Sequence, residues 1–406
     1  MGRFIVIVLD GFGAGCMEDA AQLRPADVGS HTWKHIAQAT PGLSLPHLED
    51  LGLMNIGGFE TETMKYSPSA TWGKAALTHF GADTFWGHQE ILGTRPRQPV
   101  EEPFEPHLEE TMAALTDAGF QVRVHTASQG GRLLIVNEAV TVADNIECDP
   151  GQAVNVTAAI DHIPFPQVLR IGRIVRQKVF VSRVIAFGGR GVDLSNLLNA
   201  IEEQPQFGLV GVNAPASGVY NDDYHCVHMG YGVDPATQIS TILPGVGVPV
   251  YLLGKVADIV ENPVPQHSFS IVPTPQVMAK TLELIRANDT CFLCANVQET
   301  DLCGHRENIG EYVRILRQAD EGLGPILDEL RDEDILIVMA DHGNDPTIGH
   351  PHHTREYVPL MVRGARLKPG CFGVRPTLSD VGATAAHYFH APAPGNGHSF
   401  LSDILR

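Results

Sequence analysis

Short apolar runs without polar alternation place the strongest constraint on how this chain can fold. Such runs, rich in Val, Ile and Leu, are typical of strands that are buried on both faces of a parallel sheet. Helical periodicity appears between them, at 274–287 and 308–330, and again at 377–389. Strands that alternate with helices indicate an α/β fold with a doubly wound, mainly parallel sheet. The runs are RFIVIVLD at 3–10, VPVYLLG at 248–254, TCFLCANV at 290–297, DILIVMAD at 334–341 and YVPLMVRG at 357–364.

The middle of the chain has a different pattern of hydrophobic and polar residues. A helical segment at 107–119 is followed by short strands at 121–126, 132–137 and 179–187. A chain of 406 residues is long enough for two domains. We therefore predict a core domain made of residues 1–97 and 235–406, with a smaller α/β cap domain inserted at 98–234.

The composition excludes several classes of partner. A formal net charge of -19 argues against nucleic acid, whereas an anionic small molecule is compatible with it if bound divalent cations invert the local field. No run approaches the ~18 apolar residues that cross a membrane, and the first apolar run is too short for an export signal. We therefore expect a cytoplasmic protein. Cys291 and Cys294 could form a redox or zinc pair, but their apolar flanks favour a buried strand.

Carboxylates end two of the predicted strands. Asp10 ends the first run, and Asp341 ends the fourth and is followed by His342. Ligands of open α/β sheets bind at the carboxyl ends of the strands, and a buried carboxylate there needs a partner such as a metal ion. Either Asp alone could instead cap the next helix or bind the backbone of the turn through Gly11 or Gly343. Taken together with the neighbouring imidazoles, the two indicate a metal site.

Two further segments bring carboxylates and imidazoles together. Asp301 and His305 are four residues apart after the third strand, which places both on one face of a helical turn. The segment 341–356 contains four His and two Asp within 16 residues, with Gly and Pro that favour a loop. Mixed carboxylate and imidazole ligands suit Mn²⁺ or Zn²⁺. Composition does not choose among the four candidates of this loop, which are His342, His350, His352 and His353.

Thr84 lies in a polar loop, GADTFWGHQE at 81–90. A threonine hydroxyl is a poor nucleophile unless a base or a metal ion activates it. On its own, the position of Thr84 indicates a turn or cap residue.

Together these segments resemble the alkaline phosphatase superfamily, in particular its cofactor-independent phosphomutases, and they are most similar to phosphopentomutases. The combination of DHGNDPT with HTRE is specific, whereas DGFG alone is a weak signal. The motifs occur in the family's order and cover the core domain at both ends. They are VLDGFGAG at 8–15, GADTFWGHQE at 81–90, LLGKVADIV at 252–260, ADHGNDPT at 340–347, HHTREYVPLMVRG at 352–364, TLSDVGATAA at 377–386 and HSFL at 398–401.

The resemblance implies an alkaline-phosphatase-like core that holds two divalent cations per chain, predicted to be Mn²⁺, with Zn²⁺ or Mg²⁺ as alternatives. It also selects His353 from the histidines of the 341–356 loop, through the HTRE match. One metal site would consist of Asp10, Asp341 and His342 with Thr84 as a shared ligand, and the other of Asp301, His305 and His353.

The resemblance further implies a reaction. Thr84 would be the catalytic phosphate acceptor of a phosphomutase that acts on a small phosphorylated sugar, converting ribose or deoxyribose 1-phosphate to the 5-phosphate through a bisphosphate. Lys255 matches a family lysine near the substrate, and His88 and Glu90 match residues beside the phosphothreonine loop, so all three are predicted to bind substrate.

The sequence also departs from phosphopentomutases. The spacing of Asp301 and His305 is that of cofactor-independent phosphoglycerate mutases, and Trp86 and Gln89 replace family residues around Gly-His. In the predicted cap domain, Ala159 stands where the family has a sugar-binding acid, and the family's arginines for the sugar phosphate are not found. A phosphohydrolase, or a mutase of another phosphorylated metabolite, is therefore the alternative, and a non-catalytic binding protein is disfavoured because every expected ligand position is filled. A sulfatase is disfavoured because the Cys-x-Pro-x-Arg motif is absent.

Overall fold

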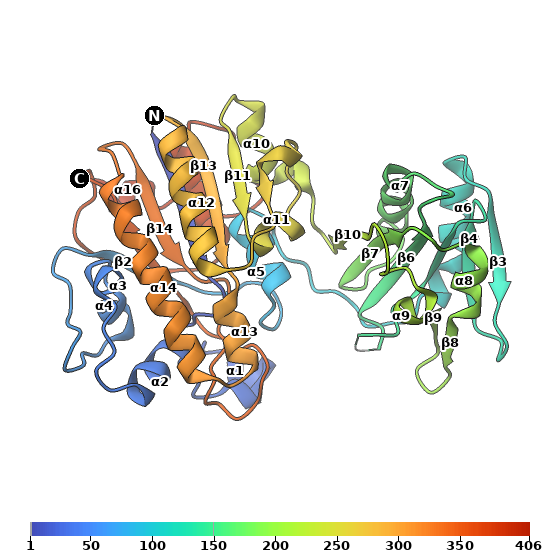
Figure 1. Ribbon diagram of the computed structural model, residues 1–406, viewed down its shortest axis with the longest axis horizontal. Coiled ribbons are helices and arrows are strands. Elements are labelled where there is room, and N and C mark those ends of the chain that lie inside the picture. The colour runs from blue at the N-terminus through green and yellow to red at the C-terminus, as the bar shows by residue number, and fades with distance from the viewer. Residues whose placement is uncertain (1, 149) are drawn as a thin grey trace. The chain divides into compact units, whose positions relative to one another are not determined.

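The computed structural model describes residues 2–148 and 150–406, which divide into two compact units. The first, called here the core unit, combines residues 2–96 with 234–406, and the second, the inserted unit, spans 97–233 (Figure 1). Each unit has its own sheet and its own hydrophobic core.

The described part of the core unit contains an eight-stranded, mainly parallel sheet. Strand β1 lies at its centre, between β13 and β14, and is parallel to both. All of its residues are buried, as expected for an apolar run covered on both faces. In sheet order the strands are β12 (Ser268–Phe269), β11 (Val250–Leu253), β13 (Cys291–Val297), β1 (Arg3–Leu9), β14 (Ile335–Met339), β15 (Val358–Arg363), β2 (Thr71–Ala75) and β16 (Gly370–Arg375).

All five apolar runs form strands, but the strand formed by the fifth run is antiparallel to its neighbours in the sheet. Strand β15 runs antiparallel to both β14 and β2. The chain between β14 and β15 contains no helix, and a parallel return would need a crossover connection of the helical kind. Cys291 and Cys294 are buried within β13, where the core interpretation places them.

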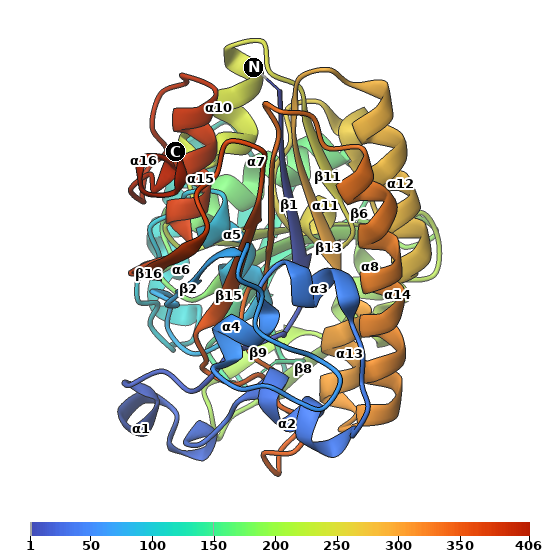
Figure 2. The same ribbon diagram turned by 90° about the vertical axis from the view of Figure 1, so that its left-hand side faces the viewer.

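Helices cover both faces of this sheet. Figure 2 shows α12 and α14 on one face and α10 and α15 on the other. In α14, the buried residues recur at helical spacing and include Asp320, whose carboxylate binds Leu48 N and His47. The helices of the core unit are α1 (Ala20–Leu23), α2 (Thr32–Ala39), α3 (Pro46–Asp50), α4 (Leu53–Gly57), α5 (Thr84–Ile91), α10 (Ile239–Gly245), α11 (Lys255–Ile259), α12 (Thr274–Ala287), α13 (Glu299–His305), α14 (Ile309–Asp328), α15 (Ser379–Tyr388) and α16 (Leu401–Ile404).

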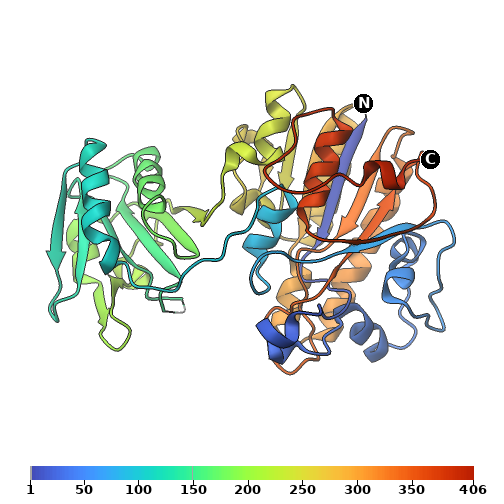
Figure 3. The same cartoon turned by 180° about the vertical axis from the view of Figure 1, so that it is seen from behind.

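The inserted unit is a smaller α/β unit. Among its described residues a six-stranded sheet is mostly antiparallel, with one parallel pair, β6 and β7. Helices α6 and α7 lie side by side against one face of that sheet (Figure 3). The elements are α6 (Leu108–Asp117), β3 (Val122–Thr126), β4 (Arg132–Val136), β5 (Val140–Asp144), β6 (Ala153–Ala159), α7 (Phe165–Arg176), β7 (Arg183–Gly189), α8 (Leu194–Asn199), β8 (Ile201–Gln204), β9 (Leu209–Val212), α9 (Ala214–Ser217) and β10 (His225–Gly230).

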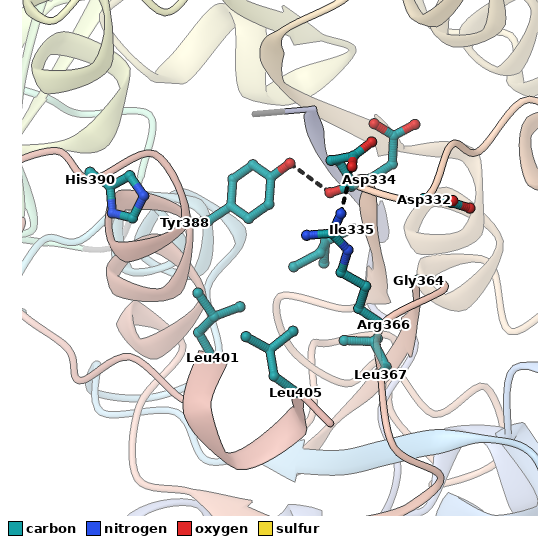
Figure 4. Close-up of a pocket in the computed structure, with 11 residues that line it drawn as sticks. Asp332, Asp334, Ile335, Gly364, Arg366, Leu367, Tyr388, His390, Leu401 and Leu405 are labelled. Atoms are coloured by element: carbon teal, nitrogen blue, oxygen red, sulfur yellow. Dashed lines mark hydrogen bonds and ion pairs between the residues drawn. The ribbon is translucent and has the colours of Figure 1, made fainter.

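A cavity of about 330 Å³ opens at the start of β14 (Figure 4). It is lined by Ile335, the first residue of β14, and by residues of α15 and α16. The Tyr388 hydroxyl there donates to Glu333 O at 2.6 Å and accepts from Gly2 N at 2.8 Å. Because ligands of open α/β sheets bind beyond the carboxyl ends of the strands, this cavity lies at the wrong end of β14 for the candidate site. None of the helices in 2–148 and 150–406 has the length and apolar character of a membrane span.

Candidate metal centre

The three central parallel strands end at the same edge of the core sheet. In register, Leu9 of β1 pairs with Val297 of β13, and Val8 pairs with Met339 of β14. Asp10 therefore emerges beside the segment that starts α13 and beside Asp341. This shared register is what brings the carboxylates and imidazoles predicted from the sequence to one place.

The first group of candidate ligands is Asp10, Asp341 and His342, whose ligand atoms lie within 4.8 Å of one another. All three are fully buried. His342 Nε2 is 3.3 Å from both Asp10 Oδ1 and Asp341 Oδ2. Asp341 Oδ1 also accepts a hydrogen bond from Gly11 N at 3.1 Å, so this carboxylate binds the turn as well as facing the cluster.

Thr84 joins this first group. It is the first residue of α5, and the side chain of the preceding Asp83 caps the helix by accepting from Trp86 N at 3.1 Å. Thr84 Oγ1 donates to Asp341 Oδ2 at 2.8 Å and lies 3.2 Å from Asp10 Oδ1. The position of Thr84 alone had indicated a turn or cap residue. In the structure its hydroxyl faces two carboxylates, and the preceding Asp83 is the cap of α5.

The second group is formed by Asp301, His305 and His353. Asp301 Oδ2 lies 3.4 Å from His305 Nε2, and Asp301 Oδ1 lies 3.2 Å from His353 Nε2. The two imidazole Nε2 atoms are 2.9 Å apart. Asp301, His342 and His353 also have ligand atoms within 4.8 Å of one another, so the two groups are adjacent.

The two remaining histidines of the 341–356 loop lie elsewhere. His350 Nε2 is 3.2 Å from Asp27 Oδ1, and His352 is exposed. The structure thus brings His342 and His353 into the cluster.

Backbone carbonyls orient the imidazoles of the cluster. His342 Nδ1 donates to Gly343 O at 3.0 Å, His305 Nδ1 to Pro351 O at 2.6 Å, and His353 Nδ1 to Ala82 O at 3.0 Å. Because a carbonyl only accepts, Nδ1 carries the proton in each ring, and the Nε2 atom faces the carboxylates. His342 Nε2 is buried and has no hydrogen-bond partner among the described residues. Three Nε2 atoms presented to three carboxylates fit a divalent metal ion.

The buried carboxylates of the cluster need positive charge nearby. Burial would raise the pKa of Asp341, but His342, His88 and Lys255 outweigh burial and hold it well below the usual range. Burial opposes a proton on His342, yet Asp341 and Asp10 raise the pKa of that imidazole to about 10. Without a metal ion, protons and Lys255 compensate the carboxylate charge. Metal binding would displace the proton from His342, because only a neutral imidazole is a ligand.

Two of the three predicted substrate-binding residues lie in the cluster. Lys255 Nζ is 3.0 Å from Asp10 Oδ2, 3.2 Å from Asp301 Oδ2 and 3.3 Å from Thr84 Oγ1. The preceding Gly254 has φ +74, and a Cβ there would lie 2.4 Å from Asn296 O, so only glycine lets the start of α11 approach β13 this closely. His88 is fully buried, and its Nδ1 lies 2.8 Å from Thr84 O and 3.2 Å from Asp341 Oδ2.

The third, Glu90, is not brought into the cluster. It is fully buried, and its carboxylate accepts hydrogen bonds from Thr78, His79, Thr377 and Leu378. Nothing in this environment supports the substrate-binding role predicted for Glu90.

Comparison with known proteins places this sequence in a family. The sequence model of the metalloenzyme superfamily matches residues 2–393. Phosphopentomutases of Desulfitobacterium hafniense (strain DSM 10664 / DCB-2) and Acetivibrio thermocellus are each 32% identical to this chain, over 100% of both chains. The chain belongs to the phosphopentomutase family of the metalloenzyme superfamily. A further phosphopentomutase, from Symbiobacterium thermophilum, is 29% identical over 100% of this chain and 99% of its own.

Membership of the phosphopentomutase family makes the chain a metal-dependent enzyme of the isomerase class. The similarity extends through the inserted unit, where the sequence motifs had found departures from the family pattern. Among solved structures, Leishmania mexicana phosphoglycerate mutase matches with a TM-score of 0.47 and 13% identity, covering 98% of this chain and 97% of that one.

Sequence reasoning missed two asparagines that contact the cluster of this phosphopentomutase family member. Asn296 Nδ2 donates to Asp10 Oδ2 at 3.0 Å and lies 3.0 Å from His88 Nε2. Asn344 Nδ2 donates to Asp301 Oδ1 at 2.8 Å. Asn296 could have been found from the sequence, because it is a polar residue within an apolar run. It is fully buried in β13, and a buried amide needs a polar partner.

A tight backbone contact between α5 and Asp341 leads to a prediction. A Cβ added at Gly87 would lie 2.7 Å from Asp341 O and 2.8 Å from Asp341 Cβ. Gly87→Ala should therefore push α5 and Thr84 away from the carboxylates and lower kcat by about 10²-fold. Steady-state kinetics of the metal-loaded variant measure this.

Gly310→Ala is the matched control. A Cβ at Gly310, in α14, would meet its nearest neighbour at 3.6 Å, which is ordinary contact. This variant should keep the wild-type rate and gain up to about 1 kcal/mol of stability from the better helix former. Equal rates for both variants would contradict the expected displacement of Thr84.

Proposed function

We propose that this enzyme moves a phosphoryl group between the 1- and 5-hydroxyls of ribose or deoxyribose, with Thr84 as the intermediate carrier. The single observation that carries the proposal is the position of Thr84 Oγ1, between the carboxylates of Asp10 and Asp341 and the ammonium group of Lys255. The full-length similarity to phosphopentomutases supports the choice of pentose phosphate.

The residues around Thr84 suit transfer to and from its hydroxyl. Asp341 Oδ2 accepts a hydrogen bond from the Thr84 hydroxyl at 2.8 Å, so this carboxylate orients the oxygen that would attack phosphorus. Lys255 Nζ donates to the same Oγ1 at 3.3 Å, and its positive charge offsets negative charge that gathers on the threonine oxygen or on a phosphoryl group attached to it. Neighbouring charges, Asp10 above all, raise the pKa of Lys255 against the effect of burial, so it stays protonated.

Two divalent cations, which we propose to be Mn²⁺, would be held by the two groups of ligands. Asp10, Asp341 and His342 would hold one with Thr84 Oγ1, and Asp301, His305 and His353 the other. Bound cations would neutralise charge on the transferring phosphoryl group and clamp the attacking and leaving oxygens.

The proposed cycle conserves both phosphoryl groups. With Thr84 phosphorylated, the free hydroxyl of the sugar phosphate attacks phosphorus and gives up its proton, the bond from phosphorus to Oγ1 breaks, and Oγ1 takes up a proton as the bisphosphate forms. The bisphosphate reorients, Oγ1 gives up its proton and attacks the other phosphorus, and the sugar oxygen that leaves takes up a proton. The net change is the position of one phosphoryl group on the sugar, with Thr84 phosphorylated again.

The test is an assay of the Mn²⁺-loaded enzyme with ribose 1-phosphate as substrate. Phosphorus NMR identifies the products. We expect conversion to ribose 5-phosphate with little inorganic phosphate. Release of inorganic phosphate at the rate of substrate loss would instead establish a phosphohydrolase. Turnover of a hexose phosphate, with none of the pentose phosphate, would establish a mutase of another sugar.

A further inference from the structure

The loop that leads to Thr84, residues 77–83, is bound along one side by a single buried arginine. Arg355 Nη1 donates to His79 O at 2.8 Å and to Gly81 O at 2.6 Å, and Nη2 donates to Leu77 O at 3.1 Å. Asp19 completes the environment of the guanidinium through two hydrogen bonds of 2.8 Å. Arg355 is only 3% exposed. A rigid guanidinium that holds three carbonyl oxygens fixes the path of this loop in a way that a lysine ammonium cannot reproduce.

A buried carboxylate binds the amide side of the same loop. Glu90 accepts hydrogen bonds from Thr78 N at 3.1 Å and from His79 N at 3.2 Å. The Thr78 hydroxyl adds a third bond to Glu90, at 2.6 Å. Burial opposes the charge on Glu90, but His79 and the threonine hydroxyls outweigh it and lower the pKa of the carboxyl group.

The side chain of His79 links Glu90 to the residue that caps the helix starting at Thr84. Its Nδ1 lies 2.8 Å from Glu90 Oε2, and its Nε2 accepts from Asp83 N at 3.3 Å. Asp83 caps α5. On the other side, the candidate ligand His353 donates to Ala82 O. The segment 353–355 therefore contacts the candidate metal cluster and the Thr84 loop at once.

From these contacts we propose that Arg355 and Glu90 are positioning residues, which set the Thr84 hydroxyl against the carboxylates of Asp10 and Asp341. Neither touches substrate in this proposal, which rests on the proposed role of Thr84 as acceptor. Transfer to a hydroxyl depends on its placement within a fraction of an ångström. Residues that fix the backbone before Thr84 therefore control the rate of transfer rather than the affinity for the sugar phosphate.

The first test is Arg355→Lys, with Arg3→Lys as its control. Arg3 is also buried, pairs with Asp334 and donates to the backbone carbonyls of Ile285 and Glu329, but it lies at the start of β1, away from the cluster. We expect Arg355→Lys to lower kcat by about 10²-fold, with KM for ribose 1-phosphate and metal content close to wild type. Arg3→Lys should lose stability while keeping kcat.

The second test is Glu90→Gln, with Asp380→Asn as its control. Asp380 is a fully buried carboxylate that accepts from His398 N and Arg375 Nε, each at 2.7 Å, and in the described part of the chain it forms no hydrogen bond with the 77–83 loop. A glutamine offers one carbonyl oxygen where Glu90 offers two acceptors, so part of the amide side of the loop is released. We expect kcat to fall only in Glu90→Gln.

Hydrogen exchange of the amides in 77–86 gives a readout that does not depend on activity. Exchange there should be faster in Arg355→Lys and Glu90→Gln than in wild type, and unchanged in the two controls. Wild-type exchange and wild-type kcat in both test variants would overturn the proposal, as would equal loss of kcat in test and control variants. If the wild-type enzyme itself transfers no phosphoryl group, the proposed function fails, and hydrogen exchange alone still decides whether these residues fix the loop.

Discussion

Replacing Thr84 with alanine is expected to reduce phosphoryl transfer from ribose 1-phosphate by at least about 10⁴-fold, the scale of losses seen when an enzyme's nucleophile is removed. Alanine has no oxygen to accept the group, and no other described hydroxyl is placed between Asp10 and Asp341. The fold should survive, because the hydroxyl bonds only to charged groups of the cluster. The measurement is the initial rate together with the mass of the intact protein, which should lack the phosphoryl group carried by wild type.

Thr84→Ser is the matched control for this prediction. Serine keeps the hydroxyl and loses only a methyl group, so it should still be phosphorylated and should keep measurable transfer. Wild-type activity in Thr84→Ala would rule out this residue as the acceptor. Loss of activity in both variants would show that the methyl group is needed, so the loss in Thr84→Ala could no longer be assigned to the oxygen.

Removing the metal ions should have the second large effect. The buried carboxylates of Asp10, Asp301 and Asp341 would lose their cations, and several kcal/mol of transition-state stabilisation would be lost with them, which is a fall in rate of more than about 10³-fold. The free energy of unfolding should also fall, by about 4 kcal/mol relative to protein with free metal at 1,000 times its Kd. Activity and melting temperature are measured before chelation, after it and after return of Mn²⁺.

His342→Ala is the control for metal removal. His342 has ligand atoms near both groups, so this variant should bind metal weakly, and chelation should change its melting temperature much less than that of wild type. Full activity in protein shown by elemental analysis to hold no metal would contradict the prediction.

Much of the core unit could be predicted from sequence because its strands are buried on both faces. β1, β13 and β14 come from apolar runs and are buried along their whole length. Asp10 follows β1, α13 follows β13, and Asp341 follows β14. β2 and β16 gave no such signal: β2 alternates buried and half-buried residues, and β16 is largely exposed at the sheet edge. Element position could therefore be predicted where hydrophobic burial alone decides it.

The inserted unit and the surroundings of Thr84 were harder to predict. The run at 179–187 was expected to be one strand, but β7 begins only at Arg183, and β5 and β6 were not predicted. Arg355 was part of a recognised motif, yet its contacts with the carbonyls of the Thr84 loop depend on residues almost 280 positions away in sequence. Such pairings follow from the packing of the sheet, which local sequence patterns do not report.

The central position of β1 has a consequence for how the chain is made. β1 is synthesised before both of its neighbours in the sheet, which are β13, at 291–297, and β14, at 335–339. The sheet strands of the inserted unit all lie within 122–230, so this unit has every strand it needs while the central strand of the core still lacks a partner. Because domains fold as units during synthesis, the inserted unit should fold before β1 acquires its neighbours, and β1 should stay unpaired until β14 has been made.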